Sequence, residues 1–113
     1  MFGLTPNTHV FVRTGATDGR YGANALKGVV INQIREDPHG KQLFCFCNRA
    51  RNRIKLLWHD GTGFWVAGKM MPKGGYDFPA NGAAVARMSM AQLEVLVKGV
   101  QFTRVAKSPR YRR

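Results

Sequence analysis

Acidic residues are scarce in this sequence of 113 residues, which has 6 Asp and Glu against 18 Lys and Arg. Nucleases and strand transferases that hold divalent metal need several carboxylates in one place. Each acid here has a structural interpretation instead: Asp18 and Asp37 at predicted helix ends, Asp60 in a glycine-containing turn, Glu36 and Glu94 on predicted helix surfaces, and Asp77 in a short aromatic segment. Walker, dinucleotide and nucleophile-elbow patterns are also missing. We therefore expect no enzyme, no catalytic residue, no cofactor and no small-molecule substrate.

Long apolar runs are also missing. The stretch at residues 43–47 is far shorter than the ~20 residues that cross a bilayer. The first twenty residues contain no apolar core of a secretory signal. We expect no membrane contact and a cytoplasmic location.

Cysteine occurs only as Cys45 and Cys47, two residues apart in a predicted strand. Such a pair shares one face, but the Cα atoms lie ~6.5 to 7 Å apart, at or beyond the usual disulfide limit. His39 and His59 could in principle join them in a zinc site, but structural zinc sites use a wider cysteine spacing and a second matched pair. Reduced core thiols and no metal are expected.

Apolar residues are plentiful, at 44% of the chain with 11% aromatic, so one domain with one core is predicted. We place this domain at residues 1–103. The segment 104–113 has no apolar period and is rich in Lys and Arg, which predicts a basic flexible tail.

Apolar periodicity predicts the elements of this domain. A strand is expected at 8–13 and a helix at 20–35, with Asp18 as its N-cap and Asp37-Pro38 as its stop. Three strands at 41–47, 53–59 and 64–70 follow as a meander. A short strand at 76–78, a loop at 80–86 and a final helix complete the prediction. The final helix begins with the capping box of Ser89 and Gln92 and ends at Gly99.

The middle strand alternates between two faces. One face carries Arg53, Lys55, Leu57 and His59, and the other, with Ile54, Leu56 and Trp58, is expected to pack on the first helix. Gly22 and Gly28 are expected to permit close approach of that helix to the sheet. The predicted class is α+β, an antiparallel sheet of four or five strands with one helix across a face and a C-terminal helix.

Basic residues form the most informative pattern. Arg49, Arg51, Arg53 and Lys55 follow the hairpin tip and one strand, and Lys69 and Lys41 on neighbouring strands could extend the patch. In a chain of formal net charge +12, such a stripe favours contact with successive phosphates of nucleic acid. The tail cations Arg110, Arg112 and Arg113 are secondary candidates. The alternative is a solvated hairpin whose charges keep an edge soluble.

Several motifs together resemble one family. They are Leu43-Phe44-Cys45-Phe46, the run RARNRIKLLW at 49–58, Asp60-Gly61-Thr62-Gly63-Phe64 with Lys69, Asp18-Gly19-Arg20-Tyr21-Gly22 before Leu26, Gly75-Tyr76-Asp77-Phe78-Pro79, and the closing helix. Residues 5–102 thus resemble the TnpB accessory protein of the insertion-sequence-sixty-six class of bacterial transposable elements. The motif residues that the resemblance carries over are Asp18, Arg20, Gly22, Arg49, Arg53, Lys55, Trp58, Asp60, Gly61, Gly63 and Lys69.

The resemblance implies a small protein encoded beside a transposase and needed for efficient transposition, without established catalysis. It gives the motif residues no proven roles. An ion pair that fixes a loop is the simplest interpretation of Asp18 and Arg20. The expected partners are DNA and the element-encoded transposase subunits. Two alternatives stay open: an adaptor that contacts the transposase through an apolar patch around Trp65 and Met70-Met71, and a general RNA-binding protein.

Overall fold

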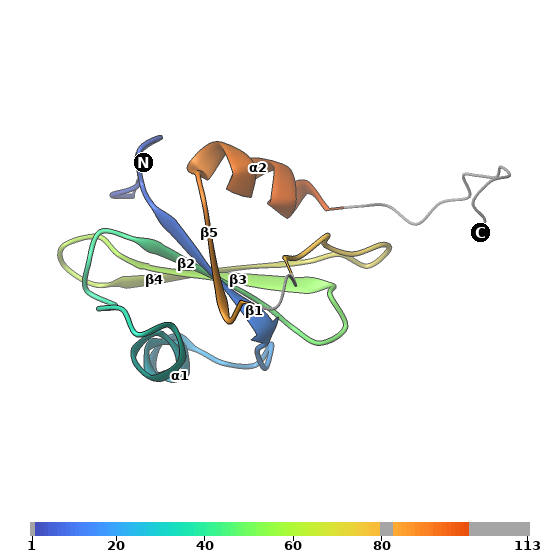
Figure 1. Cartoon of the computed structure of the whole chain (residues 1–113), viewed down its shortest axis with the longest axis horizontal. Coiled ribbons are helices and arrows are strands. Elements are labelled where there is room, and N and C mark those ends of the chain that lie inside the picture. The colour runs from blue at the N-terminus through green and yellow to red at the C-terminus, as the bar shows by residue number, and fades with distance from the viewer. Residues whose placement is uncertain (1, 80–82, 100–113) are drawn as a thin grey trace, which may run out of the picture.

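One five-stranded sheet lies between two helices (Figure 1). The structure is a computed structural model, and it describes residues 2–79 and 83–99. In chain order the elements are β1 (Val10–Ala16), α1 (Ala23–Val29), the π-helical turn η1 (Val30–Ile34), β2 (Leu43–Cys47), β3 (Arg53–His59), β4 (Phe64–Met70), β5 (Val85–Met88) and α2 (Met90–Lys98). The predicted tail at 104–113 lies outside the described residues.

The sheet is mixed, with the strand order β4-β3-β2-β1-β5. Strands β2, β3 and β4 form the predicted antiparallel meander. Strand β1, however, pairs with β2 in parallel, and β5 pairs with β1 antiparallel. The α+β class is confirmed, whereas a wholly antiparallel sheet is wrong. The helical segment between β1 and β2 returns the chain to the end where β1 began, which makes the two strands parallel.

The element bounds agree with the sequence for the three meander strands and the two helices. Two predictions nearby are wrong. Residues 76–78 form no strand: Tyr76 donates its backbone N–H to the Arg51 carbonyl (2.8 Å), but the pairing stays an isolated bridge at Gly75, and the Tyr76 ring is buried. Part of the predicted loop 80–86 belongs to β5, which at four residues is too short to show a clear strand period and pairs with β1 from Val10↔Met88 to Arg13↔Val85.

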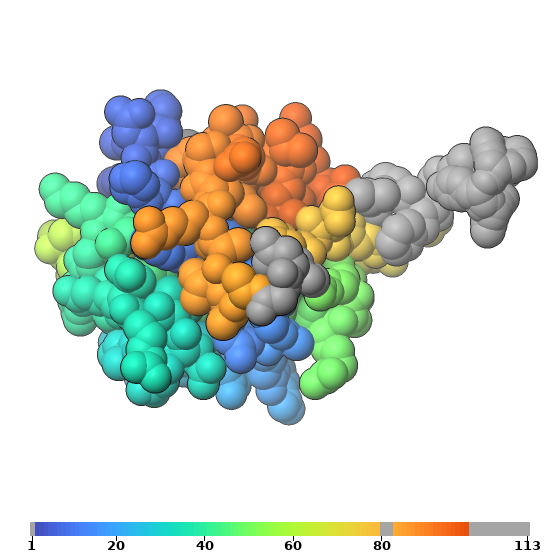
Figure 2. All heavy atoms as spheres, in the orientation of Figure 1, coloured from blue at the N-terminus to red at the C-terminus, as the bar shows by residue number. Residues whose placement is uncertain are grey.

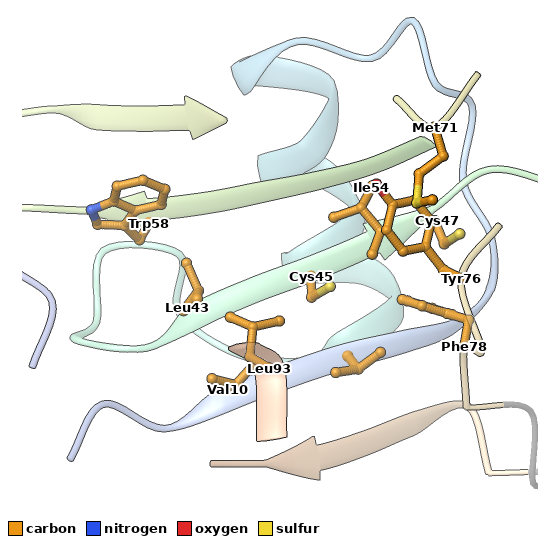
Figure 3. Packing of buried hydrophobic residues seen from close by; sticks show 11 residues of the cluster. Val10, Leu43, Cys45, Cys47, Ile54, Trp58, Met71, Tyr76, Phe78 and Leu93 are labelled. Atoms are coloured by element: carbon orange, nitrogen blue, oxygen red, sulfur yellow. The ribbon is translucent and has the colours of Figure 1, made fainter. Parts of the chain in front are cut away.

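The core has two halves, one on each face of the sheet. On the first face, α1 and η1 cover aromatic and aliphatic side chains; this cluster is Phe11, Leu26, Val30, Ile34, Phe44, Phe46 and Leu57. On the second face, α2 and the segment after β4 cover Leu43, Cys45, Ile54, Trp58 and their neighbours (Figure 3). Every residue of β2 is buried, as expected for a central strand with both faces covered.

The prediction that the Ile54 and Trp58 face of β3 packs on the first helix is wrong. Ile54 and Trp58 pack on the α2 side with Leu93, whereas Leu57 packs against α1. Alternation separates the two faces of a strand, but it does not say which helix covers each face. Cys45 and Cys47 are free and buried among the α2-side residues, as expected for core thiols. Burial raises the pKa of the Cys45 thiol far above its usual range.

The helix ends show which local signals act. In α2 the predicted capping box is present: Gln92 donates its N–H to Ser89 Oγ (3.1 Å), and Ser89 donates its N–H to Gln92 Oε1 (2.8 Å). In α1 the N-cap is Gly22 rather than the predicted Asp18, without a side-chain cap. A Cβ at Gly22 or Gly28 would meet nothing within 4 Å, so these glycines do not mark a close approach.

Candidate nucleic-acid interface

Two loops lie next to each other at one end of the sheet: the segment after β1 and the turn between β2 and β3. Thr17 joins them by donating its N–H to the Cys47 carbonyl (2.8 Å). In the turn, Asn48 Oδ1 accepts the N–H groups of Asn52 (3.1 Å) and Arg53 (3.0 Å). Asn48 Nδ2 also donates to Asn52 Oδ1 (2.8 Å). The two asparagines therefore hold the hairpin tip that carries the arginines.

Asp18 and Arg20 form the expected ion pair within the first loop. Arg20 Nη2 lies 2.7 Å from Asp18 Oδ2, and Arg20 Nε donates to Asp18 Oδ1 (3.0 Å). The Arg20 backbone N–H also donates to Asp18 Oδ1 (2.9 Å). Hydrogen bonds from Arg20 lower the pKa of Asp18 from 3.8 to about 2. The side chain of Arg20 is 88% exposed, so much of its guanidinium is open to solvent.

Four cations gather around Asp18, and we call this set the basic shelf: Arg20, Arg49, Arg53 and Lys55. Asp18 and Arg49 line one open hollow of about 470 Å³ between the two loops, together with Ala16, Thr17, Gly19, Asn48 and Ala50. Asp18 also lines a small gap beside it with Arg53 and Lys55. In Figure 2 the blue loop and the green hairpin tip meet at the lower right of the molecule.

The backbone of the first loop fixes two shelf side chains. Lys55 Nζ donates to the Tyr21 carbonyl (2.7 Å), which carries its ammonium across to the loop. Gly19 passes close to Arg53, since a Cβ at Gly19 would lie 3.3 Å from Arg53 Cδ. Four cations and one carboxylate give the shelf a formal charge of +3. Arg49 and Arg53 are exposed, so their guanidinium groups can form bidentate contacts with phosphate.

The structure divides the predicted stripe between the two faces of the sheet. Arg51 adopts a left-handed backbone (φ 62°), and its guanidinium lies over the Phe78 ring (5.6 Å) on the α2 side. Lys69 is paired with Ile54 and donates to the Val97 carbonyl of α2 (2.8 Å). Neither residue joins the basic shelf. Lys41 precedes β2 and is exposed, and Arg110, Arg112 and Arg113 lie outside the described residues.

A second group of motif residues builds the turn between β3 and β4. The Asp60 carboxylate accepts the N–H groups of Thr62 (2.9 Å) and Gly63 (3.0 Å) and the indole N–H of Trp65 (2.8 Å). These bonds lower the pKa of Asp60 well below its usual range. Gly61 has a φ of 105°, a conformation that favours glycine. The geometry gives Asp60 and Gly61 a role in shaping this turn.

Trp58 belongs to the same end of the sheet. Its indole donates to the Phe2 carbonyl (2.8 Å), and its ring stacks on Trp65 at 6.0 Å between centroids. Trp65 in turn contacts the Phe2 ring at 4.8 Å. Trp58 is thus a buried anchor for the N-terminal segment. Of the apolar patch predicted around Trp65 and Met70-Met71, Met71 is buried in the α2-side core, while Trp65 and Met70 are exposed.

The candidate metal ligands lie on different faces. Cys45 and Cys47 point into the α2-side core, whereas His39, His59 and Phe64 contact one another in tilted or edge-on arrangements, with ring centroids 4.8 to 5.1 Å apart. Within residues 2–79 and 83–99, no group of three or more potential ligands is placed to hold a metal ion. In the same ranges, no helix has the length and apolar character to span a membrane.

Sequence reasoning missed the residues that position the shelf. Asn48 and Asn52 flank Arg49 and Arg51, and asparagines at such a spacing are typical of a turn held by side-chain hydrogen bonds. This spacing was the signal from which their role could have been predicted. Tyr21 acts through its backbone carbonyl, and its residue type gives no hint of that contact. The link between Arg20 and the hairpin also needs the loop of β1 to lie beside β2, which is a matter of tertiary structure.

The site therefore belongs to a basic α+β protein with exposed cations beside a braced hairpin. The family model of IS66 Orf2 like proteins matches residues 8–107, and the chain belongs to this family. Membership associates it with the transposition machinery of IS66-type elements, in an accessory role rather than that of a known enzyme.

Two relatives come from Sinorhizobium fredii (strain NBRC 101917 / NGR234). The uncharacterized protein y4hO is 34% identical over 97 residues, which cover 85% of this chain and 84% of that protein. The uncharacterized protein y4jC is 28% identical over 109 residues, covering 96% and 93% respectively. No solved structure matches the chain significantly.

Proposed function

We propose that this protein is a non-enzymatic accessory factor of transposition that binds DNA through the basic shelf and helps to assemble the transposase on the element. The observation that carries the proposal is the gathering of four cations around Asp18: Arg20 is paired with it, Arg49 lines the open hollow with it, and Arg53 and Lys55 line the adjoining small gap with it. The formal net charge of +12 would attract a polyanion from a distance. Phosphate contacts of this kind position a protein on DNA without reading its sequence.

The shelf suits a phosphate backbone better than a small anion. It is open to solvent and spans two loops, so its cations can meet several phosphates in succession. Asp18 holds Arg20 in place by two side-chain contacts and leaves much of that side chain exposed. A DNA strand that approaches the hollow lined by Asp18 and Arg49 would therefore meet Arg20 already held by Asp18, with less side-chain entropy to lose on binding.

The test is a salt-titrated binding assay of the full chain with element-end duplex, scrambled duplex and RNA of equal length. The triple variant R49Q/R53Q/K55Q removes three shelf charges. If these three residues contact phosphates, the slope of log affinity against log salt becomes shallower by ~2 to 3 in the variant. Preference for element ends over scrambled duplex would show that bases are also read.

The matched control is R35Q/K73Q/K98Q, which removes the same charge from exposed positions outside the shelf and outside β4. Equal losses in the two triple variants would reduce the effect to overall charge and overturn the shelf as the binding surface. An adaptor that never touches DNA predicts full transposition activity in the shelf variant, and an RNA-binding protein predicts tighter binding to RNA than to either duplex.

A further inference from the structure

Strand β4 forms a long open edge of the sheet. It lies at the end of the order β4-β3-β2-β1-β5 and has seven residues. The opposite edge, β5, has only four residues and carries Arg87, whose guanidinium lies over the Phe11 ring (5.0 Å). Short, charged edges resist pairing with other chains, whereas long edges invite it. The two edges of this sheet thus differ in length and charge, and β4 is the edge more open to pairing with another strand.

The hydrogen bonds at the two ends of the β3–β4 ladder show which backbone groups face outward. Asp60 donates its N–H to the Gly63 carbonyl (3.0 Å), and Met71 donates to the Asn52 carbonyl (2.8 Å). Both pairs fit the unbroken register of the ladder, and hydrogen-bonded pairs alternate along an antiparallel ladder. The N–H and C=O groups of Phe64, Val66, Gly68 and Met70 therefore point away from β3. Within the described part of the chain, no other residue hydrogen-bonds to them.

The usual protections of an edge are missing from β4. It has no proline and no bulge, and Lys69 is its only charged residue. The Lys69 ammonium is turned onto the Val97 carbonyl of α2 rather than outward. Val66 and Met70 are 37% and 54% exposed on the α1 side of the edge. An exposed, regular and largely apolar edge is a template for another strand.

We propose that β4 pairs antiparallel with β4 of a second copy of this chain, which joins the two sheets edge to edge around a two-fold axis. Charge complementarity favours a second copy. The carboxylate of Asp60 lies at the Trp65 end of β4 and Lys69 lies at the other end, so antiparallel pairing brings opposite charges together. In a chain of net charge +12, an edge strand with a single charged residue also keeps the repulsion between two copies low.

Pairing along the whole strand defines the register. Ala67 meets Ala67 of the second copy at the axis, Val66 meets Gly68, Phe64 meets Met70, and Trp65 meets Lys69. All outward N–H and C=O groups of the four edge residues then find partners, and exposed Val66 and Met70 become covered. A shift that centres the pair on Lys69 would place two ammonium groups opposite each other, which destabilises a strand pair.

The first experiment is sedimentation velocity of the full chain over a range of concentrations, for the wild type, Val66→Lys and Val95→Lys. Val95 is the control, because it is 70% exposed on α2 and lines a hollow with Met88 of β5, the opposite edge strand. We expect a reversible dimer, a dissociation constant raised by about tenfold or more in V66K, and no change in V95K. A monomeric wild type, or equal behaviour of the two variants, would overturn the proposal.

The second experiment tests the register by mild oxidation of single cysteine variants. Ala67→Cys should form a disulfide-linked dimer, because directly opposed residues in a non-hydrogen-bonded pair lie ~4.5 Å apart at Cα. Met70→Cys, at the far end of the same edge, should not link to itself. The wild type controls for Cys45 and Cys47, which are buried. A disulfide-linked dimer of the M70C variant, together with none of the A67C variant, would contradict the register. DNA binding by the shelf does not depend on either result.

Discussion

Asp18 shows how one carboxylate can serve a basic surface. Its negative charge offsets one of the four positive charges of the shelf. It also holds Arg20 by paired contacts, and it lines both the open hollow and the small gap that the other three cations line. Asp60 has a comparable role at the other end of the sheet, where it closes the β3–β4 turn. The chain has only six acidic residues, and two of them, both motif residues, stabilise loops.

The pKa of Asp18 predicts how stability depends on pH. Its value in the folded protein, about 2, lies below the ordinary 3.8, so the ionised form stabilises the fold above pH 4, and this contribution is lost as the pH falls from about 4 to about 2. Asp18→Asn should therefore lower the urea midpoint at pH 7 but have a diminishing effect toward pH 2. Urea titrations of both proteins across this range check it; a difference that persists unchanged at pH 2 would contradict the ionic origin. Glu94→Gln is the control, because Glu94 is exposed on α2 and belongs to neither salt bridge of the described residues.

At the scale of the element, the ends of α2 have strong and separable causes. The capping box defines its start, and Gly99 defines its end with φ 74° and ψ −178°, a conformation that is essentially confined to glycine. A Cβ there would lie 3.0 Å from the Gly75 carbonyl and 2.2 Å from Met71 Sδ. The end of α2 is thus packed directly against the segment that follows β4.

Gly99→Ala should lower the free energy of unfolding by ~1 to 3 kcal/mol, because of backbone strain and the contact with the Gly75 carbonyl. Gly28→Ala is the matched control and should have the opposite sign. Gly28 lies inside α1 with nothing within 4 Å of its Cβ position, so alanine should add ~0.5 to 1 kcal/mol. Denaturant unfolding measures both, and a stabilised G99A would show that the end of α2 tolerates a side chain.

At the scale of the whole molecule, charge imbalance opposes folding. The chain has 18 basic and only 6 acidic side chains, so the excess positive charges repel one another in the compact state. The described residues contain only two salt bridges, Asp18–Arg20 and Asp37–His39. Self-repulsion of this kind is weakened by salt. A polyanion held on the shelf would relieve it more effectively than free ions.

Raising NaCl from low to moderate concentration should therefore increase the melting temperature, by several degrees if screening contributes about 1 kcal/mol. Phosphate at equal ionic strength should raise it further through binding to the shelf, and R49Q/R53Q/K55Q should lose this additional increment while keeping the response to NaCl. Thermal unfolding followed by circular dichroism makes the comparison. Identical responses to the two salts would argue against a phosphate site on the shelf.

The sequence by itself determined the features that depend on near neighbours. Alternation located β3, apolar and aromatic runs between turn residues located β2 and β4, the capping box of Ser89 and Gln92 located α2, and composition established the excess of positive charge. The hairpin arginines were visible for the same reason, since they follow one another along the chain. Such patterns are readable because a strand period or a cap is complete within a few residues.

Only the tertiary structure decided which segments became neighbours. It paired β1 parallel to β2, recruited residues 85–88 as β5, placed α1 over Leu57 rather than Ile54, and moved Arg51 and Lys69 to the face opposite Arg53. It also brought Arg20 beside the hairpin. The physical reason is that strand pairing and the covering of each face depend on contacts between residues far apart in sequence. A local sequence pattern does not specify which distant segment it will contact.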